Sequence, residues 1–169
     1  MPEFLSMETG VFLQLGSNMG NRAEIVQTAM EHIGSSVGNI SRQSAWYQTA
    51  AWGNTEQPDF LNLVLQITTS LPPAALLTAC LDVEKTLGRQ RTFKNAPRTI
   101  DIDILLYGDT VITEANLTIP HPAIQHRRFV LIPMVELAAK RVHPVLKKSF
   151  EMLLAECKDE LAVKKYSGL

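Results

Sequence analysis

Four short runs rich in apolar residues divide the first two thirds of the chain. The first is almost continuously apolar, and the others alternate between apolar and polar positions. Runs of this length and pattern predict β-strands with at least one buried face. The predicted strands are VFLQLG (11–16), ISRQSAWYQT (40–49), FLNLVLQITTS (60–70) and TIDIDILLYG (99–108).

Two longer stretches between these runs carry apolar residues at helical spacing. The first predicts a helix that begins at Asn18 or Asn21 and ends near His32. Gly34 is expected to stop it. The second predicts a helix within residues 72–88, where two prolines occupy the first turn and a glycine follows the last.

The resulting order, strand–helix–strand–strand–helix–strand, indicates the α+β class and a ferredoxin-like fold. In that fold a four-stranded antiparallel sheet carries both helices on one face, so the other face is expected to be open. After it the sequence predicts a hairpin arm at 111–113 and a proline-rich turn at 119–124. A third helix is predicted around LIPMVELAAK (131–140).

The composition favours a single folded domain over residues 1–169. A chain of this length with 46% hydrophobic residues supports one core, expected at about 11–140 after a flexible leader at 1–10. The net charge of −1 argues against a general binder of nucleic acid or membranes. No obligate protein partner is evident. Two cysteines, no signal peptide and no apolar run of about 20 residues predict a cytoplasmic protein.

The last predicted strand of the sheet carries two acids on one face. Its aliphatic side chains, which share the opposite face by alternation, are Ile100, Ile102, Ile104 and Leu106. Asp101 and Asp103 then lie about 6.5–7 Å apart at Cα and repel each other unless a cation sits between them. A solvated face paired with nearby arginines is the simpler interpretation. Mg²⁺ bound by carboxylates and phosphate oxygens is the alternative.

The segment just before this strand is basic. From Lys85 to Arg98 the chain carries several cations and no acid, so local ion pairing is not available to them. These cations are Lys85, Arg89, Arg91, Lys94 and Arg98. Together with the paired aspartates, they predict a site for Mg²⁺ and a polyphosphate. Neither a P-loop nor a Rossmann glycine motif is present to hold a nucleotide.

Other side chains are candidates for contacts with a phosphate or a flat ring. His121 lies in a PHP turn and is followed by two arginines, although a lone histidine is more often structural. Trp52 lies in a predicted loop, where packing does not readily explain it. Asn62, inside a predicted strand, can both donate and accept at the edge of a heterocycle or can satisfy the backbone.

Several segments resemble one enzyme family in the same order along the chain. KNAPRTIDIDIL (94–105) is similar to the signature of the 6-hydroxymethyl-7,8-dihydropterin pyrophosphokinases, in which Pro and Arg precede an Asp-x-Asp strand. The similarity covers about residues 11–140, and the family is ferredoxin-like. The further matching segments are LGSNMGNR (15–22), QPDFLN (57–62), GR (88–89) and IPHPAIQHRRFVL (119–131).

The resemblance implies transfer of pyrophosphate from ATP to 6-hydroxymethyl-7,8-dihydropterin in folate biosynthesis, with release of AMP. It implies that Asp101 and Asp103 hold two Mg²⁺ ions and that Arg89 and Arg98 act in catalysis. The implied ATP-binding residues are Glu84, Arg91, Arg98, Ile104, Thr118, His121 and Arg127. The implied pterin-binding residues are Thr49, Ala50, Trp52, Phe60, Asn62 and Phe129, with Phe60 and Phe129 stacking on the ring.

Two other classes of protein compete with this interpretation. A non-catalytic ferredoxin-like module that binds RNA would carry stacking aromatics in its central strands, and FLNLVLQIT and TIDIDILLY lack that pattern. A metal-dependent nucleotide hydrolase is compatible with the Asp-x-Asp motif alone. Detection of AMP formed only when the pterin is present separates the transferase from both.

Overall fold

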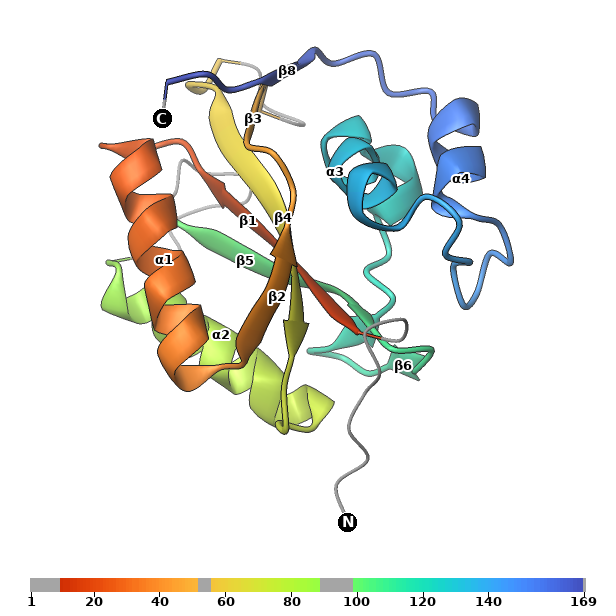
Figure 1. Cartoon of the computed structure of the whole chain (residues 1–169), viewed down its shortest axis with the longest axis horizontal. Coiled ribbons are helices and arrows are strands. Elements are labelled where there is room, and N and C mark those ends of the chain that lie inside the picture. Colours follow the sequence, from red (N-terminus) through yellow and green to blue (C-terminus); the bar gives the residue numbers. More distant parts are fainter. Residues whose placement is uncertain (1–9, 52–55, 89–98, 169) are drawn as a thin grey trace.

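A computed structural model describes residues 10–51, 56–88 and 99–168 of the chain (Figure 1). The described part has a mixed α+β fold with four α-helices: α1 (Arg22–Ser36), α2 (Pro73–Thr86), α3 (Arg128–Ala138) and α4 (Phe150–Glu156). The strands are β1 (Val11–Ser17), β2 (Asn39–Gln43), β3 (Tyr47–Thr49), β4 (Phe60–Thr68), β5 (Asp101–Tyr107), β6 (Ile112–Thr113), β7 (Thr118–Ile119) and β8 (Val163–Lys165). A 3-10 turn, η2 (Ile124–His126), precedes α3.

The main sheet is antiparallel throughout its named pairings. Its strands follow the order β5-β1-β4-β3-β8, and β2 also pairs with β4. The separate hairpin of β6 and β7 is the predicted arm. Within the described ranges, no helix is long and apolar enough to cross a membrane.

Helices α1 and α2 cover one face of the sheet (Figure 1). Val26, Ala29, Met30 and Ile33 form the buried stripe of α1, and Asn21 caps its first turn by accepting a hydrogen bond from the Glu24 N–H. They pack with the inward side chains of β1, β4 and β5 in the larger core. The prediction that the first two helices pack on the same face of the sheet is therefore confirmed.

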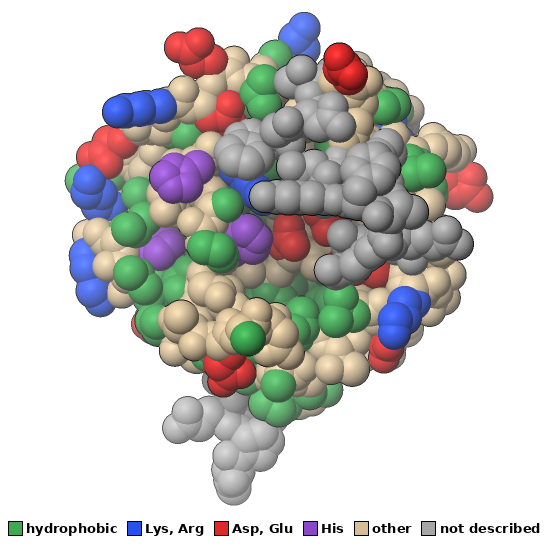
Figure 2. All heavy atoms as spheres, turned by 180° about the vertical axis from the view of Figure 1, so that it is seen from behind, with side chains coloured by type: hydrophobic (Ala, Val, Ile, Leu, Met, Phe, Trp, Pro, Cys, Tyr) green, Lys and Arg blue, Asp and Glu red, His purple; other side chains and the backbone are tan. Residues whose placement is uncertain are grey.

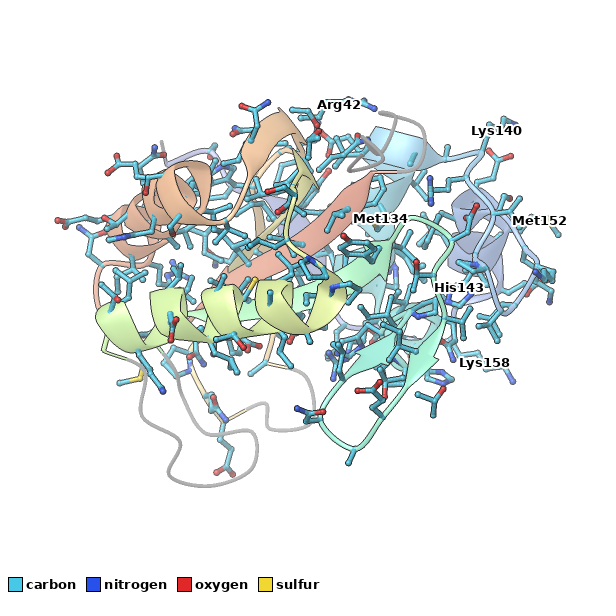
Figure 3. The ribbon with its side chains drawn as sticks, turned by 90° about the horizontal axis from the view of Figure 1, so that it is seen from below. Arg42, Met134, Lys140, His143, Met152 and Lys158 are labelled. Carbon is cyan, nitrogen blue, oxygen red and sulfur yellow. The ribbon has the colours of Figure 1, made fainter. Side chains whose placement is uncertain are left out.

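The other face is not fully open, contrary to the sequence prediction. Helix α3 packs against part of it and α4 packs beside α3, and both helices form a second core with Phe12, Val64 and Leu105. Met134 of α3 is fully buried toward the sheet, whereas Met152 of α4 is 48% exposed on the outer side (Figure 3). α4 and β8 were not predicted, because their short sequences carry weak periodicity.

The predicted orientation of Leu106 is wrong, because β5 contains a β-bulge. Leu13 pairs with Ile104 and Phe12 pairs with Leu106, so Leu105 is the extra residue on β5. Both leucines pack in the second core, away from α1 and α2. Strict alternation ends at this point, because a bulge opposes two residues on one strand to one residue on its neighbour.

Two predicted boundaries also differ from the structure. The first helix continues past Gly34 to Ser36, because an exposed glycine inside a helix costs only about 1 kcal/mol. The predicted strand at 40–49 is two strands, β2 and β3. Ser44 separates them: its N–H donates to the Val64 carbonyl, and its hydroxyl accepts from the Val64 N–H.

Candidate active site

The register of the central strands brings distant polar residues into one row. Gly16 of β1 pairs with Asp101 of β5 on one side and with Asn62 of β4 on the other. Asn62 in turn pairs with Tyr47 of β3. Residues that pair directly across strands lie side by side on the sheet. An acid and an amide 39 residues apart in sequence therefore flank one glycine.

Gly16 is required at this position because a side chain would collide with its neighbour. A Cβ atom built on Gly16 would meet the Asn62 amide oxygen too closely for real contacts and would lie 3.4 Å from the Phe60 ring. The absence of a side chain at Gly16 leaves room for the Asn62 amide on the pocket face of the sheet. The glycine thus shapes the site without supplying any chemistry itself.

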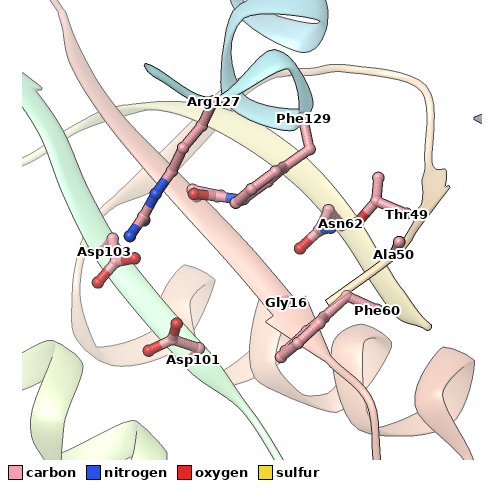
Figure 4. A pocket seen from close by; sticks show the side chains of 10 residues that line it. Gly16, Thr49, Ala50, Phe60, Asn62, Asp101, Asp103, Arg127 and Phe129 are labelled. Atoms are coloured by element: carbon pink, nitrogen blue, oxygen red, sulfur yellow. Dashed lines mark hydrogen bonds between the residues drawn. The ribbon is translucent and has the colours of Figure 1, made fainter. Parts of the chain in front are cut away.

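One pocket joins an aromatic and amide half to an acidic half. Asn62, only 3% exposed, donates a hydrogen bond of 2.5 Å to the Thr49 hydroxyl. Phe60 and Phe129 lie on opposite sides of the pocket, and the two aspartates lie at the end away from Asn62 and Thr49 (Figure 4). The lining residues are Gln14, Gly16, Thr49, Ala50, Phe60, Asn62, Asp101, Asp103, Arg127 and Phe129.

The start of α3 supplies a cation and an aromatic ring to this pocket. The Arg127 side chain extends toward Asp103, while its guanidinium carbon lies 5.7 Å from the centre of the Phe129 ring (Figure 4). Both residues lie within the first turn or N-cap of the helix. The orientation of α3 therefore decides where a positive charge and a stacking surface stand relative to the aspartates.

A second pocket shares Asp103 with the first. It is lined by Leu77, Ile102, Asp103, Ile104, Ala115, Asn116, Leu117, Thr118, His121 and Pro122. Asp103 lines both pockets, so a ligand that bridges them must pass this carboxylate. Near the middle of one face of the molecule, a histidine side chain lies beside acidic side chains (Figure 2).

His121 is held as a neutral imidazole beside the second pocket. The backbone N–H of His121 donates to the Leu105 carbonyl of β5, and the ring Nδ1 accepts from the Ala123 backbone N–H at 3.1 Å. Burial and, to a smaller extent, the Arg127 charge lower the pKa of His121 to about 4, although Asp101 opposes the shift. Since Nδ1 accepts, the proton of the neutral ring is on Nε2, which is then a donor for a ligand.

Glu84 approaches the aspartates from behind the sheet. It lies on α2, is 3% exposed, and its Oε2 accepts a hydrogen bond of 2.8 Å from the Ile102 N–H. Ile102 stands between the two aspartates on β5, the edge strand of the sheet. The carboxylate thus satisfies a backbone group that strand pairing leaves without a partner.

The two aspartates fit a divalent cation that also binds a substrate. Within residues 10–51, 56–88 and 99–168, no group of three or more His, Cys, Asp or Glu side chains is arranged to hold a metal alone. Mg²⁺ commonly takes one or two carboxylates and completes its shell with water and phosphate oxygens. Asp101 and Asp103, which line the same pocket, supply such a partial set.

Comparison with known proteins identifies the family. Residues 12–139 match the family described as 7,8-dihydro-6-hydroxymethylpterin-pyrophosphokinase (HPPK). The chain belongs to the HPPK family. An Aquifex aeolicus protein named 2-amino-4-hydroxy-6-hydroxymethyldihydropteridine pyrophosphokinase is 41% identical over 156 residues, which are 92% of this chain and 94% of the relative. A Methylorubrum extorquens protein of the same name is 41% identical over 131 residues, 77% of this chain and 83% of the relative.

Solved structures share the fold of this HPPK-family chain. A Plasmodium falciparum HPPK-DHPS triple mutant crystallised with SDX-DHP superimposes with a TM-score of 0.72 at 18% identity. The wild-type protein with SDX-DHP gives a TM-score of 0.67 at 18% identity. Each match covers 86% of this chain but less than half of the Plasmodium chain, 44% and 43% respectively. At this level of identity the likeness concerns the fold alone.

The structure brings together most of the residues that the sequence singled out. Thr49, Ala50, Phe60, Asn62 and Phe129 line the first pocket with Asp101, Asp103 and Arg127, and Ile104, Thr118 and His121 line the second. Glu84 lies on α2, on the other side of β5, and lines neither of these two pockets. Trp52, Arg89, Arg91 and Arg98 lie outside the described residues.

Gln14 is a pocket residue that the sequence interpretation missed. It is 5% exposed and pairs with Asp103 across β1 and β5. The signal was present, because alternation with Leu13 and Leu15 turns Gln14 to the face opposite the larger core. Only the pairing of β1 with β5, which sequence patterns do not reveal, places it beside the aspartate.

Proposed function

We propose that this protein transfers a pyrophosphoryl group from ATP to the hydroxymethyl oxygen of 6-hydroxymethyl-7,8-dihydropterin, an enzymatic step of folate biosynthesis. The observation that carries the proposal is the first pocket, in which an aromatic and amide half adjoins two carboxylates. The named HPPK relatives, 41% identical over most of the chain, support the same reaction.

The aromatic half suits a flat, hydrogen-bonding heterocycle. Phe60 and Phe129 offer ring faces on opposite sides, and a ring between them gains stacking as well as burial. Asn62, held by Thr49, presents amide groups that match the donors and acceptors of a pterin edge. The hydroxymethyl group then projects toward the acidic half.

The acidic half suits a triphosphate that arrives with its metal. Asp101 and Asp103 would hold Mg²⁺, two ions by the family resemblance, together with oxygens of ATP. When bound, the metal neutralises phosphate charge and favours displacement at phosphorus. Arg127 adds a fixed positive charge, and the Nε2–H of His121 donates to a phosphate oxygen. Ile104 and Thr118 line the neighbouring pocket, which we assign to the nucleoside.

The reaction follows from the meeting of these two halves. The pterin hydroxyl oxygen attacks the β-phosphorus of ATP, the bond from that phosphorus to the α–β bridging oxygen breaks, and AMP leaves. The hydroxyl proton goes to solvent, since the pocket aspartates serve the metal. Positioning of both substrates and neutralisation of charge supply most of the rate acceleration.

The remaining expectations from the sequence stay predictions. These are catalytic roles for Arg89 and Arg98, a nucleotide contact for Arg91 and a pterin contact for Trp52. The ferredoxin-like topology is a further prediction. The strand order β5-β1-β4, followed by β2 and β3, fits that topology if β2 and β3 count as one split strand. A single domain and a cytoplasmic location are the others.

The products of one incubation test the proposal. The protein is mixed with ATP, Mg²⁺ and the dihydropterin, and the nucleotides are separated. AMP in equal amount to pterin diphosphate, and none without the pterin, is the expected result. ADP, or AMP formed without the pterin, would identify a hydrolase instead. No turnover under any condition would leave a binding protein and contradict the proposal.

A further inference from the structure

We infer that Asp159, which lies beyond the family match at 12–139, is a positioning residue for the pterin half of the site. The inference rests on the proposed function. Asp159 belongs to the C-terminal segment that runs from the end of α4 back across the molecule to the sheet (Figure 1). The described hydrogen bonds of its side chain go to Arg128 and Leu161, neither of which lines the pocket, so it acts through the helix that it holds.

The first link is a hydrogen bond to the start of α3. Arg127 is the N-cap residue of this helix and makes no side-chain capping bond, and the first turn contains no acid. Asp159 Oδ2 accepts from the Arg128 N–H at 3.1 Å, so the capping acceptor comes from 31 residues away. An acceptor satisfies a free helical N–H, and its negative charge suits the positive end of the helix dipole.

The charge of Asp159 matters more here than at an average helix. Two arginines, Arg127 and Arg128, stand at the helix start, where like charge opposes the dipole. Asp159 is itself fixed, since its Oδ1 accepts from the Leu161 N–H at 3.0 Å. Both carboxylate oxygens are therefore engaged, and the helix start has one defined position relative to the tail.

The second link joins the same tail to the opposite wall of the pocket. β8 pairs with β3, with Val163 opposite Thr49 and Lys165 opposite Tyr47. The Tyr166 N–H then donates to the Trp46 carbonyl at 2.7 Å. One short segment thus holds the helix that carries Arg127 and Phe129 and the strand that carries Thr49.

A third contact fixes the C-terminal half of α3. Glu136, near its C-terminal end, accepts from the Tyr47 hydroxyl at 2.7 Å and from the Ala45 N–H at 2.8 Å. The C-terminal half of α3 is therefore tied directly to the start of β3. Loss of Asp159 frees the N-terminal half, which bears the pocket residues, while Glu136 keeps the helix docked.

The test measures pterin binding and turnover separately in Asp159→Ala and Asp159→Asn. Binding is followed by the fluorescence of 6-hydroxymethylpterin, the oxidised form of the substrate, and turnover by AMP release. In the alanine variant the Kd and KM for the pterin are expected to rise about 5- to 10-fold. The KM for ATP is expected to rise less, because only Arg127 of the ATP-binding residues moves with this helix, and the circular dichroism spectrum should not change. The asparagine variant keeps an oxygen acceptor. Its increase in log Kd for the pterin is expected to be at most half of that in the alanine variant.

Glu156→Gln is the matched control, because Glu156 ends α4 in the same region and pairs only with Lys148 among its described ion pairs. It is expected to bind the pterin like the wild type. An alanine variant with wild-type pterin Kd, or equal losses for pterin and ATP, would overturn the inference. If the wild type binds the pterin but forms no AMP, the proposed function fails, and the Kd ratio still decides the role of Asp159.

Discussion

The Glu84 carboxylate accepts a hydrogen bond at 2.8 Å from the backbone N–H of Ile102, the residue between the two pocket aspartates. Burial of this acid at 3% exposure is costly unless its oxygens are used, and the edge of β5 uses one of them. The bond fixes the strand from its rear side while the aspartates face the pocket. Glu84 therefore supports the site from α2, on the side of the larger core.

Replacement of Glu84 by alanine should damage both stability and activity. The variant leaves a buried N–H without its acceptor, so the free energy of unfolding should fall by about 1–3 kcal/mol. The rate of AMP formation should fall about 10- to 100-fold, as for other residues that support metal-binding carboxylates. Urea denaturation and a titration of activity with Mg²⁺ measure the two effects.

Glu84→Gln and Asp82→Ala complete that experiment. Glutamine keeps an acceptor for Ile102 and should retain most of the activity, and Asp82 is an exposed acid on the same helix, so its loss should change little. Wild-type activity and Mg²⁺ dependence in Glu84→Ala would show that the β5 backbone does not need this acceptor.

Gly16→Ala should weaken pterin binding. Its new methyl group meets the Asn62 amide oxygen, so the amide must rotate away from the position in which it faces the pocket. We expect the Kd for 6-hydroxymethylpterin to rise about 10-fold, which corresponds to about 1.4 kcal/mol. Fluorescence titration gives this value directly.

Gly34→Ala is the control for that glycine substitution. A Cβ atom at Gly34 meets nothing within 4 Å, and the residue lies inside α1. Its replacement should raise the free energy of unfolding by about 0.5–1 kcal/mol and leave pterin binding unchanged. Equal pterin affinity in both alanine variants would remove the steric role assigned to Gly16.

The sequence predicts the local features of this fold better than its long-range ones. Alternation in β5 correctly turns Ile102 and Ile104 to the larger core and the aspartates to the pocket. The same rule fails at Leu106, because the bulge at Leu105 depends on how β5 registers with β1. Local patterns carry no information about such registers.

The candidate site shows the same division. Asn62 and Asp101 are recognisable as unusual polar residues in apolar strands, yet only strand pairing places Gly16 between them. Coverage of the second sheet face by α3, with α4 packed beside it, also escaped prediction, since it depends on tertiary packing. Asp159 gives no sequence signal, because its partner N–H is 31 residues away.

Thr49→Val should separate pterin binding from ATP binding. Valine has nearly the shape of threonine but cannot accept the hydrogen bond from Asn62, so a buried amide donor loses its partner. The KM for the pterin should rise about 10-fold and the KM for ATP should stay within about twofold. Steady-state kinetics with each substrate varied in turn provide both values.

Thr68→Val is the matched variant. Thr68 is the last residue of β4, whereas Thr49 of β3 pairs with Phe60, its first residue, and Thr68 lines neither pocket. It should show unchanged KM values for both substrates. An equal rise in the two KM values for Thr49→Val would instead indicate a general disturbance of the site and would contradict a pterin-specific role.

His121 should make the protein less stable as the pH falls below neutrality. Its pKa is about 4 in the folded protein and about 6.5 in the unfolded chain, mainly because burial disfavours the cation. Between pH 6.5 and 4 the unfolded chain takes up a proton that folded His121 does not. The free energy of unfolding therefore falls, by up to about 1.4 kcal/mol per pH unit, and this contribution levels off below pH 4.

Urea denaturation at pH 7, 6, 5 and 4.5 tests that dependence in the wild type, His121→Gln and His126→Gln. The His121 variant should lose less stability than the wild type between pH 6.5 and 4.5. His126 is exposed, so its variant should follow the wild type. Parallel curves for wild type and His121→Gln would mean that His121 titrates normally in the folded protein.

The central claim is that Asp101 and Asp103 bring the triphosphate to a pterin held in the same pocket. The most direct test measures AMP formation by the double variant Asp101→Ala, Asp103→Ala with ATP, Mg²⁺ and the dihydropterin, beside its affinity for 6-hydroxymethylpterin. We predict a loss of at least about 10³-fold in AMP formation, with pterin affinity within about threefold of the wild type. Full AMP formation by the double variant would contradict the account.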